Sequence, residues 1–147
     1  MPHWEEHGAT YFVCLTLGRP VRVDLASASI APMVVDALRF YDQKHYDLYD
    51  YTVMPDHLHI IIKPLANDDG TERLGYIMRN LKRWMTRRIK ELVPGAEVRW
   101  QDEDYDHIIR NREDYEEKAK YIFENAWAAG LVSDPLAWPW WGRGSGE

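Results

Sequence analysis

Two histidines separated by one leucine, His57-Leu58-His59, are the residues of this chain best suited to metal chemistry. They lie in an alternating, β-branched run over residues 53–62 that is typical of a strand. Successive side chains of a strand point to opposite faces, so the two imidazoles share one face while Leu58 anchors the other. Two adjacent imidazoles suit a divalent cation that keeps room for further ligands. An ordinary polar strand face is the alternative.

Tyr121 and Asn125 form a second pair, because a spacing of four residues places them one turn apart on the same face of a helix. Tyr121 is offset from the expected apolar stripe and has Lys118 as a neighbour. A tyrosine in such a place is often a core residue whose hydroxyl reaches water. Combined with two imidazoles, a hydroxyl nucleophile and a carboxamide oxygen suit metal-assisted attack by tyrosine on a DNA phosphodiester. The apolar stripe is expected to consist of Tyr115, Ala119, Ile122, Phe123 and Ala126.

A basic face is predicted on the long helix from about Glu72 to Leu92, opposite an apolar stripe with helical spacing. No acidic residue interrupts the sequence between Arg73 and Glu91, which favours phosphate contact over a merely solvated surface. The net charge of −6 argues weakly against nucleic-acid binding, although charge distribution matters more than the total. The expected DNA-binding residues are Arg79, Lys82, Arg83, Arg87 and Lys90.

Further candidate residues lie outside these three sets. His107 follows an acidic run and would orient a group or shuttle a proton, or else serve as a structural histidine at a strand edge. Lys118 is an accessory candidate because of its place near Tyr121. Three tryptophans near the C-terminus would stack on single-stranded bases or cover a sheet edge; these are Trp138, Trp140 and Trp141.

The bulk properties describe an ordinary soluble globular protein. The chain has 147 residues, of which 46% are hydrophobic and 29% charged, and this suits one domain over 1–147 with a Trp-rich tail from about 131. Cys14 is the single cysteine, which excludes a disulfide framework and a cysteine-based zinc site. No apolar run is long enough to span a bilayer and no signal-peptide pattern opens the chain, so a cytoplasmic location is expected.

The expected element order is that of a split βαβ, ferredoxin-like α+β fold with an antiparallel sheet. Ser29 is the predicted N-cap of the first helix, and Asn111 and Gly130 are predicted to bound the last one. The predicted elements are a strand over 10–17, a helix from Ser29 to about Lys44, strands over 46–54 and 57–63, a loop over 65–71, a helix over 72–92, a short strand over 97–101 and a helix over 111–129.

The segment Met54-Pro-Asp-His57-Leu58-His59 resembles the HUH motif of the single-tyrosine HUH transposases. The segments over 99–110 and 121–132 are similar to the C-terminal signature of the REP-associated tyrosine transposases, and the tail over 134–140 also fits that family. The resemblance covers nearly the whole chain.

The resemblance implies a ferredoxin-like sheet with helices on one face and a C-terminal helix that carries a catalytic tyrosine. It implies that His57, His59 and Asn125 bind Mg²⁺ or Mn²⁺ and that Tyr121 is the nucleophile. The implied substrate is single-stranded DNA beside a hairpin of the repetitive extragenic palindrome (REP) type, cut through a 5′-phosphotyrosine intermediate. The protein would act as a monomer or a homodimer.

Two departures from the family leave alternatives open: Asp56 stands where the family usually has Asn, and Ala126 where it usually has Pro. The extra carboxylate would either tighten cation binding or repel DNA. A domesticated protein that binds hairpin DNA without cutting it is therefore the second hypothesis. A small metal-binding or metabolic enzyme on the same fold is the third, because a fold does not determine a function.

Overall fold

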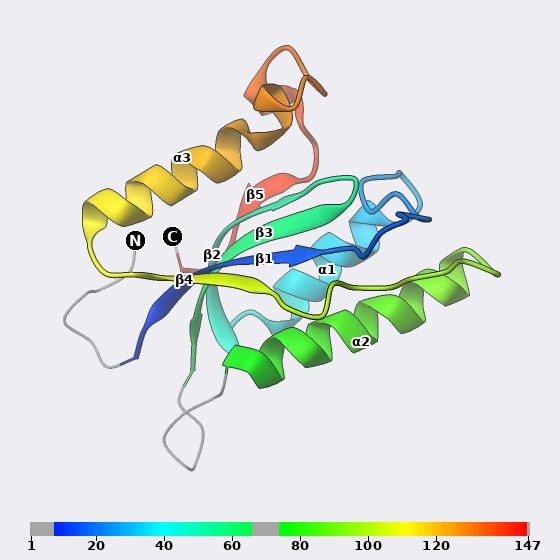
Figure 1. Ribbon diagram of the computed structural model, residues 1–147. Coiled ribbons are helices and arrows are strands. Elements are labelled where there is room, and N and C mark those ends of the chain that lie inside the picture. Colours follow the sequence, from blue (N-terminus) through cyan, green and yellow to red (C-terminus); the bar gives the residue numbers. More distant parts are fainter. Residues whose placement is uncertain (1–7, 66–73, 147) are drawn as a thin grey trace.

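A five-stranded antiparallel sheet, in the order β4-β1-β3-β2-β5, organises the chain (Figure 1). The computed structural model describes residues 8–65 and 74–146. The four strands other than β5 have the ferredoxin-like order, so the predicted α+β fold is confirmed. The elements are β1 (Thr10–Thr16), α1 (Ala31–Tyr41), β2 (Tyr46–Val53), β3 (His57–Pro64), α2 (Leu74–Leu92), β4 (Tyr105–Ile109), α3 (Arg112–Ala128), a 3₁₀ turn (Pro135–Ala137) and β5 (Trp141–Arg143).

The two faces of the sheet are covered by different helices. Helices α1 and α2 pack on one face, and α3 crosses the other (Figure 1). Cross-strand pairs alternate between the faces: Leu15 and Leu58 are paired and contribute to the α1/α2 core. The neighbouring pair, Cys14 and His59, therefore faces α3.

The register of β3 is fixed by burial of its apolar face. Leu58, Ile60 and Ile62 are each 0% exposed in the core against α1 and α2. Burying such a side chain contributes roughly 1.5–3 kcal/mol. A slip of one residue would turn these side chains toward α3 and the histidines into the apolar core. The hydrophobic face thus determines where the imidazoles point.

Helix α3 begins and ends where the sequence predicts. The Asn111 side chain caps it by accepting a hydrogen bond from the Asp114 amide at 2.8 Å. Gly130 adopts a φ of +77° just beyond the C-terminus, as the left-handed residue after a helix commonly does. These two signals set the length of the helix that carries Tyr121.

Helix α1 is shorter than predicted, and its predicted N-cap is wrong. The cap residue is Ile30 rather than Ser29, and it makes no side-chain cap hydrogen bond. Ser27 Oγ instead accepts from the Ile30 amide at 3.3 Å. The helix ends at Tyr41 rather than near Lys44, because the backbone of Asp42 is extended; Gln43 then takes a left-handed φ of 69° in the turn that leads to β2.

The fourth strand lies later in the chain than predicted. Within 97–101, Trp100 makes one isolated bridge with Leu17, and β4 itself spans Tyr105–Ile109. Hydrogen bonds from the Gly18 amide to Arg99 O (2.7 Å) and from the Gln101 amide to Thr16 O (2.8 Å) attach this connection to the end of β1. The predicted loop over 65–71 lies almost wholly outside the described residues.

The tryptophan-rich tail closes the sheet edge at β2. Strand β5 pairs with β2, and Trp138 Nε1 donates to Val53 O at 3.1 Å. Trp140 packs against the α1/α2 core, and the Trp141 ring lies 4.8 Å from that of Phe123 on α3. Of the two interpretations, the structure favours the sheet-edge role. Among residues 8–65 and 74–146, no helix combines the length and apolar character that crossing a membrane requires.

Candidate functional site

The two histidines of β3 lie side by side beneath α3. Their ring centroids are 4.8 Å apart, with the rings nearly perpendicular. His59 is 6% exposed and stacks on Phe12 of β1 at 5.2 Å, whereas the His57 side chain is 23% exposed. The predicted shared face is confirmed, and the two imidazoles differ in how deeply they are buried.

Burial keeps His59 neutral. Desolvation, followed by the nearby His57, lowers the pKa of His59 from its ordinary value to about 3. A neutral imidazole keeps a nitrogen lone pair, which a metal ligand requires. His59 is therefore in the protonation state of a ligand throughout the physiological pH range.

Tyr121 extends from α3 toward this pair. Its ring meets the His59 ring edge-on, with centroids 5.3 Å apart, and meets Phe12 at 6.0 Å. The side chain is nonetheless 50% exposed, because it lies beside rather than within the apolar stripe formed by Tyr115, Ile122 and Ala126. The structure thus places a solvent-accessible phenol against a buried imidazole.

Four buried polar atoms in this region have no hydrogen-bond partner within the described part of the chain: Thr52 Oγ1, His59 Nδ1, Asn125 Oδ1 and Trp141 Nε1. Thr52 is the cross-strand neighbour of both His59 and Trp141, so three of the atoms belong to one row across the sheet under α3. Buried polar atoms are rarely without a partner in folded proteins, so these atoms are candidates for contact with a bound ligand.

The donor set fits a hard or borderline divalent cation. A carboxamide oxygen suits Mg²⁺ or Mn²⁺, whereas an imidazole nitrogen suits borderline divalent cations, and the unpaired atoms of His59 and Asn125 supply one of each. The described residues contain no group of three or more His, Cys, Asp or Glu side chains that could hold a metal. A cation here would rely on Asn125 and on oxygens from substrate or water.

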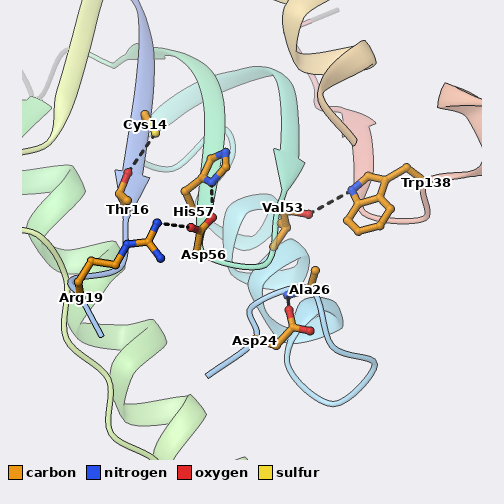
Figure 2. A network of polar contacts seen from close by, with 9 residues as sticks. All are labelled: Cys14, Thr16, Arg19, Asp24, Ala26, Val53, Asp56, His57 and Trp138. Carbon is orange, nitrogen blue, oxygen red and sulfur yellow. Dashed lines mark hydrogen bonds and ion pairs between the residues drawn. The ribbon is translucent and has the colours of Figure 1, made fainter. Parts of the chain in front are cut away.

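Asp56 fixes the second imidazole (Figure 2). His57 Nδ1 lies 2.7 Å from Asp56 Oδ1, and Arg19 donates to Asp56 Oδ2 at 3.2 Å. Partial burial acts to raise the pKa of Asp56, but the hydrogen bond and charge of His57, together with Arg19, lower it below its usual value. The carboxylate therefore stays ionised beside His57. In the sequence, the signal for this contact is that Asp56 stands where the similar family usually has Asn.

An open groove of about 560 Å³ runs between α3 and the sheet beside Tyr121. Its floor includes Phe12, Cys14 and His59, with Tyr105 of β4 at one side. Helix α3 contributes Tyr121 and both acidic and basic side chains to the wall of the groove. The charged residues are Glu117, Lys118, Lys120 and Glu124. A strand of nucleic acid or another extended ligand has room to reach the tyrosine here.

The structure distinguishes the two accessory candidates, His107 and Lys118, although both contact Asp114. His107 Nε2 lies 2.9 Å from Asp114 Oδ2 at the start of α3, and His107 does not line the groove. Lys118 lies 3.5 Å from the same carboxylate and also lines the groove with Tyr121. The structural interpretation therefore suits His107, and Lys118 stays a candidate for contact with substrate.

The basic residues of α2 form a second groove, of about 620 Å³, on the opposite side of the sheet from α3. All five predicted phosphate-binding residues line it, together with Trp100. Lys82, however, is paired with Asp104 at 2.8 and 3.0 Å, in a largely buried ion pair. Arg83 and Arg87 have no ion pair within the described ranges and are exposed. The basic face therefore exists, but it does not adjoin Tyr121.

Sequence reasoning missed Thr52 and Phe12 as neighbours of the site. Thr52 has a fully buried hydroxyl next to His59, and Phe12 contacts both His59 and Tyr121. Both follow from strand register, which could have been derived by aligning the apolar faces of the strands.

Comparison with known proteins places these features in context. No family model matches the chain. A REP-associated tyrosine transposase of Escherichia coli K12 is 26% identical over 133 residues, which span 90% of this chain and 74% of that protein. A Haemophilus influenzae protein, provisionally named for the same family, is 24% identical over 94 residues, 60% of this chain and 53% of its own length.

Solved structures show the same fold. A REP-associated tyrosine transposase bound to a REP hairpin has a TM-score of 0.73 and 23% identity, covering 96% of this chain and 82% of that one. A Deinococcus radiodurans protein provisionally named a transposase has a TM-score of 0.57 and 17% identity, covering 85% and 95%. The resemblance is thus confirmed: over nine-tenths of its length, this chain is similar to the REP-associated tyrosine transposases.

Proposed function

We propose that this protein is a metal-dependent, single-strand DNA nicking and joining enzyme that acts beside REP-like hairpins through a 5′-phosphotyrosine intermediate. The observation that carries the proposal is the contact between Tyr121 and His59 at the edge of a groove. Beside it, His59 Nδ1 is buried and unpaired, as is Asn125 Oδ1 one helical turn along α3 from Tyr121. The similarity to proteins named REP-associated tyrosine transposases supports the same reaction and a cytoplasmic site of action.

In the proposed reaction, the Tyr121 oxygen attacks the phosphorus of the scissile phosphodiester. A bond forms between Tyr121 Oη and phosphorus, the bond to the 3′ oxygen breaks, and that oxygen leaves as a 3′-hydroxyl after taking up a proton. A 3′-hydroxyl then attacks the phosphotyrosine, which restores a phosphodiester and frees the tyrosine. Half exposure of the Tyr121 ring gives the phosphate access from solvent.

His57, His59 and Asn125 would hold the cation. Bound Mg²⁺ or Mn²⁺ would polarise the phosphate and stabilise the negative charge that develops on its oxygens. Neutral His59 offers its lone pair without first losing a proton. The phenol, whose ordinary pKa is near 10, must lose its proton during attack. Lys118, which lies about one turn before Tyr121 on α3 and lines the same groove, is placed to attract the phosphate.

The α2 groove is the proposed hairpin-binding surface. It offers exposed Arg83 and Arg87 for phosphates, on the far side of the sheet from Tyr121. The two grooves border the same connection, since Trp100 lines one and Tyr105 the other. DNA held on α2 would therefore reach the tyrosine by passing this edge of the sheet. Of the acidic residues in the connection, Asp104 is already neutralised by Lys82.

The experiment is cleavage of single-stranded oligonucleotides that carry palindromic hairpins from the source genome, with Mn²⁺ or with EDTA. Wild-type protein is expected to give a metal-dependent nick and a covalent band on a denaturing protein gel. Tyr121→Phe should still retard the hairpin on a native gel and give neither product. Cleavage that survives in Tyr121→Phe would exclude the proposed nucleophile.

A protein that binds hairpins without cutting them is the second candidate. Glu117 and Glu124 favour it, because their carboxylates line the tyrosine groove and repel a phosphate backbone. Retarded migration of hairpin DNA with no metal-dependent product, across many hairpins, would support this candidate instead.

A further inference from the structure

We propose that Asp56 is a positioning residue that holds the His57 ring with Nδ1 as the hydrogen-bond donor, so that Nε2 carries the lone pair offered to the cation. The inference rests on the proposed function, because it presumes a cation between the histidines. It goes beyond that function by assigning a role to a side chain that is neither nucleophile nor ligand.

The contact itself is short and charge-assisted. His57 Nδ1 lies 2.7 Å from Asp56 Oδ1. An aspartate side chain is ionised at neutral and alkaline pH, so the carboxylate is the acceptor in this bond. An ionised carboxylate has no proton to give, so the proton in this bond belongs to Nδ1. In a neutral imidazole, one donating nitrogen leaves the other as the acceptor, and this fixes which nitrogen can bind a metal.

The backbone holds Asp56 independently of its side chain. The Asp56 carbonyl accepts from the Leu17 amide at 2.8 Å, and the adjacent Pro55 carbonyl accepts from the Leu25 amide at 2.9 Å. Across the turn, the Met54 amide donates to the His57 carbonyl at 2.8 Å. The carboxylate therefore projects from a turn fixed at three points.

Arg19 adds a second contact from the same region of the chain. It follows Leu17 by two residues and donates to Asp56 Oδ2 at 3.2 Å (Figure 2). Its side chain is 74% exposed, so solvent weakens this ion pair. Arg19 steadies the carboxylate, but the His57 bond and the backbone are expected to dominate.

His59 provides the internal contrast. Its Nδ1 is buried without a partner in the described part of the chain, so nothing there selects its tautomer. Packing against Phe12 and Tyr121 orients the His59 ring, but of the two imidazoles it is His57 whose Nδ1 has a hydrogen-bond partner in the protein. Loss of Asp56 should release His57 and leave His59 unchanged.

The first test reads the tautomer in metal-free protein, by ¹⁵N NMR of the histidine rings at pH 8. Wild-type His57 is expected to carry its proton on Nδ1. Asp56→Ala should shift His57 toward a mixture of tautomers, whereas Asp56→Asn, whose side-chain oxygen still accepts, should preserve the wild-type signal. Asp24→Asn is the matched control, since that carboxylate accepts from the Ala26 amide nearby and does not touch His57 (Figure 2). An unchanged His57 tautomer in Asp56→Ala would overturn the proposal.

The second test measures Mn²⁺ affinity by calorimetry, with thermal melts of the metal-free proteins to confirm folding. Asp56→Ala is expected to weaken binding roughly 10–100-fold, the usual effect of removing a partner behind a metal ligand. Asp56→Asn should recover most of that affinity, and Asp24→Asn should bind as wild type does. Equal affinity in wild type and Asp56→Ala would overturn the role of Asp56 alone. Failure of wild type to bind Mn²⁺ would overturn the proposed metal-dependent function and, with it, this role.

Discussion

The ring of Tyr121 meets the ring of His59 edge-on, with centroids 5.3 Å apart, although the two residues are 62 positions apart in the chain. Phe12 contacts both rings. These contacts involve the aromatic ring of Tyr121 and not its hydroxyl, so the ring position does not depend on the hydroxyl. The structure therefore allows the nucleophile to be removed without moving its neighbours.

Replacing Asn125 with alanine should separate stability from metal binding. Its buried Oδ1 has no partner in the described residues, so Asn125→Ala should leave the metal-free protein as stable as wild type or slightly more stable. Wild type should gain about 2.7 kcal/mol at a Mn²⁺ concentration about 100 times Kd. The variant should lose most of this gain in thermal melts. A full Mn²⁺ shift in Asn125→Ala would remove this residue from the ligand set.

The exposed residues Arg83 and Arg87 on α2 should contribute to hairpin binding and not to stability. Arg83→Ala with Arg87→Ala should weaken hairpin binding and reduce the slope of log affinity against log salt by about 0.9 for each phosphate that is no longer neutralised. The free energy of unfolding should hardly change, because both side chains are exposed. Fluorescence anisotropy at several salt concentrations measures the slope. An unchanged slope would show that the hairpin binds elsewhere.

Lys82→Met should instead affect the fold. Lys82 is paired with Asp104, and loss of the ammonium leaves a largely buried carboxylate without its cation. We expect a decrease of about 1–3 kcal/mol in the free energy of unfolding, measured in urea. The double variant Lys82→Met with Asp104→Leu should recover much of that stability. A single variant as stable as wild type would show that the ion pair contributes little.

Asp114 should make the protein sensitive to acid. Burial alone acts to raise the pKa of Asp114, but His107 and Lys118 more than offset it, so the folded-state value lies below the ordinary one. The resulting stability is present above the ordinary carboxyl pKa and is lost as pH falls through the lowered value. Between about pH 5 and pH 2, Asp114→Asn should therefore lose less stability than wild type in urea titrations. Parallel decreases in the two proteins would contradict the assignment.

Local patterns predicted much of the fold. The alternation that surrounds His57 and His59 predicted β3 and its two faces, and Asn111 and Gly130 bounded α3 correctly. The order of elements then pointed to the ferredoxin-like sheet. Errors occurred where pairing with distant segments decides the outcome, as in the fourth strand. Trp100 of the predicted segment makes an isolated bridge to Leu17, and the strand that pairs along β1 is Tyr105–Ile109.

The site was predictable only in part, for physical reasons. Spacing alone indicates that His57 and His59 share a face and that Tyr121 and Asn125 do as well. Spacing does not tell which face of the sheet α3 covers. It therefore could not predict that α2, with its basic side chains, lies on the opposite face of the sheet from Tyr121. The carboxylate that orients His57 likewise depends on a turn geometry set by distant backbone contacts from Leu17 and Leu25.

The most direct test of the central claim is to locate the protein–DNA bond. Wild-type protein incubated with hairpin DNA and Mn²⁺ would be digested with protease and nuclease, and the modified peptide sequenced by mass spectrometry. The account predicts a nucleotide attached through its 5′ phosphate to the peptide containing Tyr121, and no modified peptide from Tyr121→Phe. A nucleotide on another residue, or nicked DNA without any modified peptide, would contradict it.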